Sequence, residues 1–387
     1  METISAPSSQ DHQELWVTRW TKIVAATFAV IIFLVLVSLV PVGYVIQYPG
    51  PTINVLGDQG DTTILEFSQS GDFDDLAVRV EGEDDGELRM VTVSTLGGPG
   101  TTVRVGDIVK SWFTPGATVR KYSDLYAPQT TAEDVASAGA AQMESSHSAA
   151  AIAAMDYLGA PMVTEMIVVG TSEGSDAEGK LLEGDILVSI ETSDGFVHEV
   201  DKPSVPFSLL EETEPGTTLV VTVLREGEVL PVNIVTSAPV VPEGEEPVEG
   251  SKMGIYLGAN TELAMDVVIH LERVGGPSAG LVFALGIIDR LTPDGITGGE
   301  TVAATGALDF VGNVIPIGGV VQKMYGAQRD GAEWFLLPAE NCAEAAGREP
   351  NGLSAVPVRT LAEAVGAVEA IAAGQGADLP GCPISVS

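Results

Sequence analysis

Basic residues are scarce in this sequence of 387 residues. Its 18 lysines and arginines are outnumbered by 54 aspartates and glutamates, for a formal charge of −36. No basic stripe occurs, so we do not expect a nucleic-acid partner. The acidic runs, such as "EGEDDGE" and "EGEEPVE", lack ordered ligand spacing. They indicate a solvated surface, and we expect neither a metal nor another cofactor.

Cysteine and histidine are also scarce. Cys342 and Cys382 could pair outside the cytoplasm, but the sequence leaves open whether they do or remain separate thiols. The histidines are His12, His147, His198 and His270. The GNSGG motif of trypsin-like enzymes is not present, and a Ser-His-Asp triad is not expected.

One long run lacks charge altogether. Residues 23–46, "IVAATFAVIIFLVLVSLVPVGYVI", are long enough to span a bilayer. Arg19 and Lys22 precede the run and no basic residue follows before Arg79, which predicts residues 1–22 in the cytoplasm and the bulk of the chain outside. A cleaved signal peptide is the alternative, but no small-x-small site follows directly. We predict a retained single-pass transmembrane helix in the cell membrane.

Three further segments follow this run. Residues 47–158 form a membrane-proximal region that mixes strand-like runs with an Ala-rich helix behind a capping box. Residues 159–237 contain strands, one short helix and a hairpin, and "GKLLEGDILVSI" within them resembles a bacterial PDZ domain. Such domains bind extended peptides by adding a strand to a sheet edge. Residues 238–251, "APVVPEGEEPVEGS", form a linker.

One stretch has the spacing of a phosphate loop. It runs from Gly174 to Lys180, but Leu181 follows where a Mg²⁺-binding Ser or Thr is needed. The stretch also does not join a strand to a long helix. We therefore expect no nucleotide binding, and we find no Walker A motif in the sequence.

The stretch "RVGGPSAGLVFALGIID" places one serine at the start of an apolar helix, expected over residues 278–290. Glycines allow a close backbone approach, and proline is tolerated in a first helical turn. Free N–H groups gather at a helix N-terminus, where an oxyanion formed by Ser278 would find donors. An ordinary N-cap serine has the same pattern.

A serine nucleophile needs a base, and a lysine can serve when burial lowers its pKa. Only Lys323 lies inside an apolar helix, in "IGGVVQKMYGA". An amphipathic helix with its lysine in solvent is the alternative.

Together, "MDVVIHLERVGGPSAG" and "TVAATGALDFVGNVIPIGGVVQKMYGA" resemble the proteolytic domain of Lon proteases, over residues 252–374. Residues 375–387 would be a C-terminal tail. The resemblance implies Ser278 as nucleophile, Lys323 as general base and Thr305 as the residue that orients the lysine. The backbone from Gly275 through Gly276 to Ser278 would supply the oxyanion hole. ATP-dependent Lon proteins usually have an acid at the position of Gly275, which puts acid-based gating in doubt.

The order of segments resembles the membrane-anchored, PDZ-containing Lon-like proteases of Gram-positive bacteria. It implies a multidomain α+β fold: a transmembrane helix, a mixed membrane-proximal region, a PDZ-like β-rich module and a Lon-type α/β proteolytic domain. The implied function is an ATP-independent serine endopeptidase that cleaves unfolded or membrane-proximal proteins recruited by the PDZ-like module. A hexamer is implied by resemblance alone.

Two other functions are possible. One is a PDZ-based adaptor on an inactive or latent protease scaffold, and the intact set of Ser278, Lys323 and Thr305 argues against it. The other is a C-terminal processing peptidase, whose serine context differs from "GGPSAG".

Overall fold

The computed structural model describes residues 9–60, 62–69, 86–127, 129–160, 162–239, 250–263, 265–271 and 274–383. The chain divides into two compact units. Unit 1 comprises residues 1–49 and 93–135, and unit 2 comprises residues 50–92 and 136–387. Most of the predicted linker and the end of the predicted C-terminal tail lie outside the described residues.

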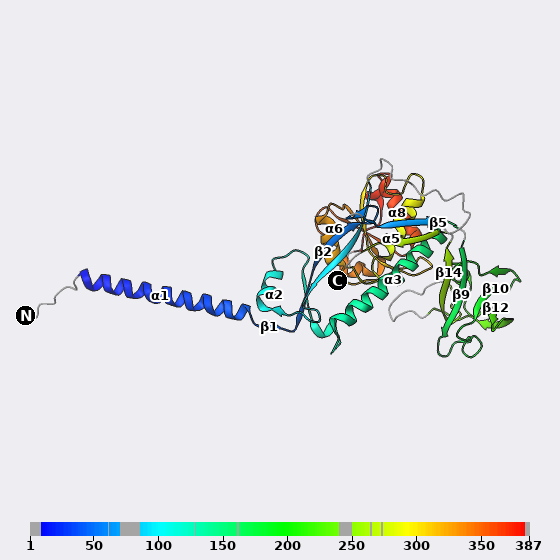
Figure 1. The fold of residues 1–387 in the computed structure, drawn as a ribbon, viewed down its shortest axis with the longest axis horizontal. Helices are drawn as coiled ribbons and strands as arrows, with labels where there is room; N and C mark the ends of the chain where they lie inside the picture. Colours follow the sequence, from blue (N-terminus) through cyan, green and yellow to red (C-terminus); the bar gives the residue numbers. More distant parts are fainter. Residues whose placement is uncertain are drawn as a thin grey trace, which may run out of the picture. The chain divides into compact units, whose positions relative to one another are not determined.

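Unit 1 is made of two helices and short strands (Figure 1). Its elements are α1 (Ser9–Ser38), β1 (Pro41–Val42), the start of β2 (Tyr44–Asn54), the end of β6 (Glu87–Leu96), β7 (Val103–Arg104), α2 (Val105–Ser111), β8 (Thr118–Lys121) and the 3₁₀ turn η1 (Tyr122–Asp124). β1 pairs with β7, and the first residues of β2 pair with β8, both antiparallel.

The predicted transmembrane helix over residues 23–46 is wrong, and so is the single-pass membrane location drawn from it. Helix α1 ends at Ser38 and the chain continues as β1 and β2. Pro41 disfavours helical geometry at the residue before it, so the apolar run is divided between a helix and strands. Its helical part has about 16 residues, roughly 24 Å, short of a hydrocarbon core of about 30 Å. Among the described residues, no helix combines the length and the apolar character needed to cross a membrane.

Unit 2 is built on a sheet with parallel central strands. β16 (Thr301–Ala304) pairs in parallel with β6 and with β19 (Trp334–Pro338), and β19 pairs in parallel with β20 (Ser354–Val358). Strand β6 therefore supplies a central position from the region before the β-rich module. A second strand from that region, β5 (Leu65–Gln69), pairs antiparallel with β15 (Met265–Ile269). Smaller elements are β3 (Asp58–Gln59), β4 (Thr62–Thr63), β17 (Ala307–Leu308), β18 (Val314–Ile315), η2 (Ala339–Asn341), α7 (Cys342–Ala345) and η3 (Gly376–Asp378).

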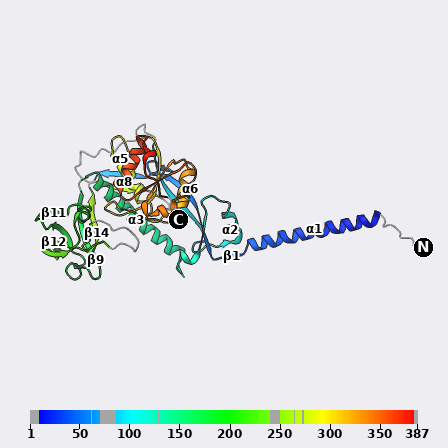
Figure 2. The same ribbon diagram turned by 180° about the vertical axis from the view of Figure 1, so that it is seen from behind.

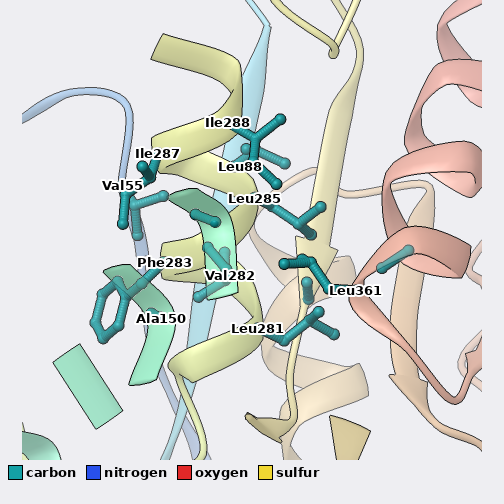
Figure 3. Close-up of a cluster of buried hydrophobic side chains, with 14 of the residues drawn as sticks. Val55, Leu88, Ala150, Leu281, Val282, Phe283, Leu285, Ile287, Ile288 and Leu361 are labelled. Carbon is teal, nitrogen blue, oxygen red and sulfur yellow. The ribbon is translucent and has the colours of Figure 1, made fainter. Parts of the chain in front are cut away.

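The main apolar core of unit 2 surrounds α5 (Gly280–Leu291). Every residue of α5 is buried, and its first nine residues are all apolar or glycine, as in a core helix. Figure 3 shows its side chains against Val55, Leu88 and Ala150, all from segments that precede the β-rich module. Ala150 belongs to α3 (Ala132–Tyr157), which is one continuous helix. The core is completed by α8 (Leu361–Ala372), next to α5.

The β-rich module is a six-stranded sheet with the order β13-β12-β10-β9-β14, and β11 pairs with β10 (Figures 1 and 2). Its elements are β9 (Met162–Thr171), β10 (Ile186–Glu191), β11 (Val197–Glu199), α4 (Val205–Glu212), β12 (Thr218–Arg225), β13 (Glu228–Val235) and β14 (Ile255–Leu263). β14 pairs antiparallel with β9 along its whole length, so the sheet takes an edge strand from beyond the predicted linker. The hairpin β12–β13 turns at Glu226 and Gly227, as predicted.

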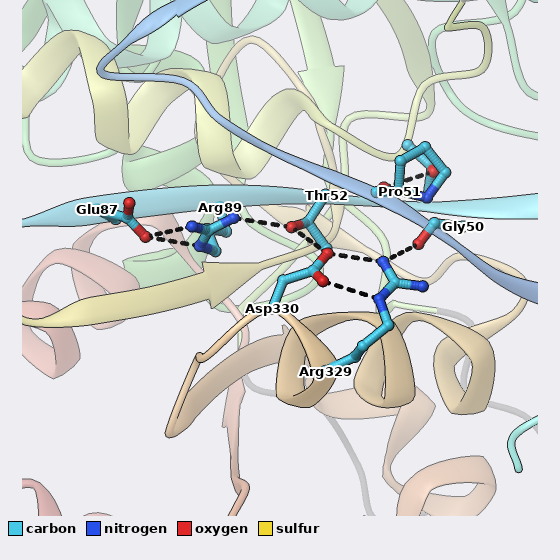
Figure 4. Close-up of polar contacts among 8 residues, drawn as sticks. Gly50, Pro51, Thr52, Glu87, Arg89, Arg329 and Asp330 are labelled. Carbon is cyan, nitrogen blue, oxygen red and sulfur yellow. Dashed lines mark hydrogen bonds and ion pairs between the residues drawn. The ribbon is translucent and has the colours of Figure 1, made fainter.

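A polar network fixes the end of α6 (Val320–Arg329) to the sheet (Figure 4). Arg329 donates to the Gly50 carbonyl at 2.9 Å, and Thr52 donates to the Asp330 carboxylate at 2.8 Å. Arg89 in β6 in turn donates to Thr52 at 3.0 Å. The hydrogen bonds from Arg329 and Thr52 hold the pKa of Asp330 down at about 2. Helix α6 is thus tied to β2 and β6 at its C-terminal end.

Candidate active site

Ser278 lies in a half-buried turn just before α5. The helix begins at Gly280 with Ala279 as N-cap, two residues later than predicted, so Ser278 does not cap it. The carbonyl of Ser278 accepts a hydrogen bond from the Gly306 N–H at 3.0 Å and a second from the Thr305 hydroxyl at 3.1 Å. The serine turn is therefore joined to the segment that follows β16.

Lys323 lies in the first turn of α6 and is only 3% exposed. Gly319, whose positive φ of 75° suits glycine, begins the helix and accepts the Lys323 N–H at 3.1 Å. Val320, Met324 and the other residues around the lysine are buried, so its side chain lies on the core face. Burial lowers the pKa of Lys323 to about 7, and the charge of Glu344 opposes this in part.

The hydroxyl of Thr305 connects the two candidate residues. Thr305 is fully buried, accepts a hydrogen bond from Lys323 Nζ at 2.9 Å, and donates to the Ser278 carbonyl. Because a hydroxyl has one proton, these two contacts fix its direction. Ser278, Thr305 and Lys323 come from three separate segments and meet at this single oxygen.

The segment before α6 is held in place by the last residue of η2. Asn341 accepts from the Ile317 N–H and donates to the Ile317 carbonyl, both at 2.9 Å. The next residue, Cys342, forms a disulfide with Cys382. The two cysteines are therefore paired, which the sequence alone left open. The disulfide also joins the C-terminal segment to the residue next to Asn341, which holds the segment before α6.

The two glycines before Ser278 contact α3. Gly276 has a φ of 100°, and its N–H donates to the carbonyl of Gly139 at 3.0 Å. A Cβ on Gly275 would lie 3.3 Å from the backbone of Gly139, so the two segments are closely packed. The Gly276 N–H therefore has a partner in α3, and this amide does not face an open oxyanion hole.

Sequence reasoning missed the contribution of α3. Ser146 is buried and its hydroxyl donates to the Pro277 carbonyl at 3.2 Å. His147, on the same helix, meets the ring of Phe283 edge-on at 5.1 Å. One available signal was Gly139, because a glycine inside an Ala-rich helix costs about 1 kcal/mol and indicates close packing.

The remaining sequence candidates lie elsewhere. His270 is half-buried, and its Nε2 forms a hydrogen bond with the Glu66 carboxylate at 2.7 Å. Lys180 of the phosphate-loop look-alike binds the carboxylate of Asp176 at 2.8 Å and the carbonyl of Asn233, and strand β10 follows it rather than a helix. Among the residues that the structure describes, no three His, Cys, Asp or Glu side chains gather as metal ligands.

Comparison with known proteins gives the class of this part of the chain. Residues 258–365 match the family model "Lon protease (S16) C-terminal proteolytic domain". This match covers the Ser278 turn, Thr305 and Lys323. This part of the chain is therefore similar to the proteolytic domain of Lon proteases.

Particular relatives agree with this class. Lon protease of Rhizobium meliloti is 34% identical over 107 residues, which are 26% of this chain and 13% of that protein. Lon protease 2 of Bacillus subtilis is 36% identical over 103 residues, 25% of this chain and 18% of that protein. Lon protease of Brucella suis is 38% identical over 105 residues, which are 25% of this chain and 13% of that protein. The chain thus spans less than a fifth of the length of these relatives.

Among solved structures, the PDZ domain of an SdrC-like protein from Listeria monocytogenes is similar at 19% identity. The alignment covers 24% of this chain and 85% of that domain, with a TM-score of 0.19.

Proposed function

We propose that this chain is a serine endopeptidase with Ser278 as nucleophile and Lys323 as general base. The observation that carries the proposal is the buried Lys323, whose lowered pKa of about 7 leaves much of the amine neutral at neutral pH. A neutral amine accepts a proton, whereas an ammonium in solvent does not. The hydrogen bond through Thr305 places this amine beside the turn of Ser278.

The reaction follows from these groups. Lys323 takes the proton of the Ser278 hydroxyl while the oxygen attacks a peptide carbonyl, and then returns it to the leaving amine. The C–N bond breaks and an ester to Ser278 remains, which water hydrolyses. Thr305 orients the lysine amine as an acceptor of its hydrogen bond. Backbone amides of the Ser278 turn would stabilise the oxyanion.

No step in this reaction uses ATP, so we propose ATP-independent cleavage. Cleavage that is not coupled to ATP-driven unfolding would act on unfolded chains and spare compact ones. Assembly into a hexamer, as the sequence resemblance implies, remains part of this proposal.

We further propose that the β-rich module recruits substrates as a PDZ domain does. β14 is an edge strand, and an extended segment can add to such an edge through main-chain hydrogen bonds. The module also contacts the proteolytic domain, because Phe207 of α4 meets Phe310 edge-on at 6.1 Å. Phe310 lies at the tip of the hairpin β17–β18, between Thr305 and Lys323 in sequence.

The test is cleavage of an unfolded casein-like protein by the full chain without ATP. We expect activity in the wild type and in Lys202→Ala, a partly exposed lysine in the β-rich module, and none in Ser278→Ala or Lys323→Ala. Unchanged cleavage by Ser278→Ala would overturn the assignment. An inactive wild type that still binds unfolded chains would favour the adaptor function.

A further inference from the structure

Helix α3 contacts the Ser278 turn at two peptide groups, the one that joins Gly275 to Gly276 and the one that joins Pro277 to Ser278. The Gly139 carbonyl accepts the Gly276 N–H at 3.0 Å, and the Ser146 hydroxyl donates to the Pro277 carbonyl at 3.2 Å. Both contacts lie directly before the candidate nucleophile. They come from residues seven apart on α3, which is two helical turns, so they share one face of the helix.

The helix that makes these contacts is itself fixed. Ala150, Ala154 and Met155 of α3 are fully buried in the main core. His147 packs edge-on against Phe283 of α5, one turn after Ser278. Helix α3 is therefore a rigid support on which the turn rests.

The turn needs such a support. It contains two adjacent glycines, and an unrestrained residue gains about 1–2 kcal/mol of backbone entropy at 25 °C. Gly276 adopts a φ of 100°, a region open chiefly to glycine. The two hydrogen bonds to α3 fix the orientation of the peptide groups that contain the Gly276 N–H and the Pro277 carbonyl. The orientation of these groups in turn fixes the backbone of Ser278.

We propose that Ser146 is a positioning residue for the Ser278 nucleophile, acting through the Pro277 carbonyl, with Gly139 as its partner on α3. This rests on the proposed peptidase function and assigns a role to the segment before the β-rich module. Ser146 takes no part in proton transfer. Its effect is on the fraction of molecules in which the Ser278 hydroxyl is aligned for attack.

The test compares Ser146→Ala with Ser148→Ala. Ser148 is exposed on the same helix, and its hydroxyl donates to the Glu144 carbonyl of that helix at 3.2 Å. The substitution Ser148→Ala therefore removes a similar hydroxyl at a position away from the turn. The measured quantities are kcat and KM on a short fluorogenic peptide and the rate at which a fluorophosphonate probe labels Ser278. Thermal melting followed by circular dichroism reports folding.

We expect Ser146→Ala to lower kcat and the labelling rate about tenfold, with KM and the pH midpoint unchanged, because a misplaced nucleophile slows acylation without altering Lys323. Ser146→Thr, which keeps the hydroxyl, should recover most of the rate. Gly139→Val, whose branched side chain presses on Gly275, should lower the labelling rate as Ser146→Ala does. Ser148→Ala should match the wild type.

Wild-type labelling rates in a folded Ser146→Ala protein would overturn this proposal and leave the Ser278–Lys323 assignment intact. An equal loss in Ser148→Ala would also overturn it, because the effect would then come from α3 in general. Absence of labelling at Ser278 in the wild type would instead overturn the proposed function, and this inference with it.

Discussion

Replacing Lys323 by methionine should stabilise the protein while abolishing its cleavage activity. Lys323 is 3% exposed and surrounded by apolar side chains, and its amine donates a hydrogen bond to the Thr305 hydroxyl. Methionine has a similar length, is flexible enough to fill the same space and has no charge to bury. The substitution therefore removes the free-energy cost of a buried ammonium and does not change the fold.

The size of the gain follows from the pKa of Lys323. Folding lowers it from 10.5 to about 7. Each pKa unit corresponds to about 1.4 kcal/mol, so the penalty in the wild type is on the order of 5 kcal/mol at low pH. The lost hydrogen bond to Thr305 offsets about 1 kcal/mol of it. We expect Lys323→Met to raise the free energy of unfolding by roughly 4 kcal/mol below pH 7.

The gain should also depend on pH with a definite sign. Below pH 7 the lysine is charged in both the folded and the unfolded chain, and the full penalty applies. Between pH 7 and 10.5 only the unfolded chain binds the proton strongly, so wild-type stability rises with pH. The advantage of Lys323→Met should therefore be largest below pH 7 and vanish by about pH 10.5.

Urea unfolding followed by circular dichroism at pH 6, 8 and 9.5 measures this difference. The difference between the two free energies of unfolding cancels the contribution of every group that titrates alike in both proteins. A difference that stays constant with pH would refute a lowered pKa at Lys323. A Lys323→Met protein less stable than the wild type at pH 6 would show that the charge is compensated in the folded state.

Three other outcomes are expected. The wild-type kcat/KM on a short peptide should rise with pH through a midpoint near 7, because Lys323 acts as a base only when neutral; a rate that falls over pH 6–8 would contradict this role. Phe310→Ala should slow cleavage of an unfolded protein about two- to tenfold, the value of an aromatic pair, and leave short-peptide cleavage within twofold; equal effects on both would argue against coupling to the module. Arg225→Ala should destabilise the chain by about 3 kcal/mol in urea unfolding at pH 7, because Asp185 is 1% exposed and bonded by that arginine. Since the pairing lowers the Asp185 pKa from 3.8, the loss should shrink as the pH falls below 3.8.

Much of the local structure could be predicted from the sequence. The capping box at Thr131 and Asp134 forms as expected, with reciprocal bonds of 2.9 and 3.1 Å. The Thr360 hydroxyl also caps α8, where it accepts a hydrogen bond from the Glu363 N–H. Such features depend on residues three apart, and their energetics are complete within one turn of helix. Ser278 and Lys323 were identified as candidates through the resemblance of "GGPSAG" and "QKM" to Lon proteases, and their catalytic roles stay a prediction.

The tertiary structure alone decided what lies next to these residues. The division of the apolar run 23–46 between α1 and two strands depends on strand partners elsewhere in the chain, which hydropathy does not contain. The disulfide between Cys342 and Cys382 needed a Cα distance, which is 5.1 Å. The pKa of Lys323 depends on burial supplied by many segments, and the hold of Ser146 on the Ser278 turn joins residues 131 positions apart. The sequence determined which groups could do chemistry, and packing determined their protonation and their alignment, because both depend on neighbours that are distant along the chain.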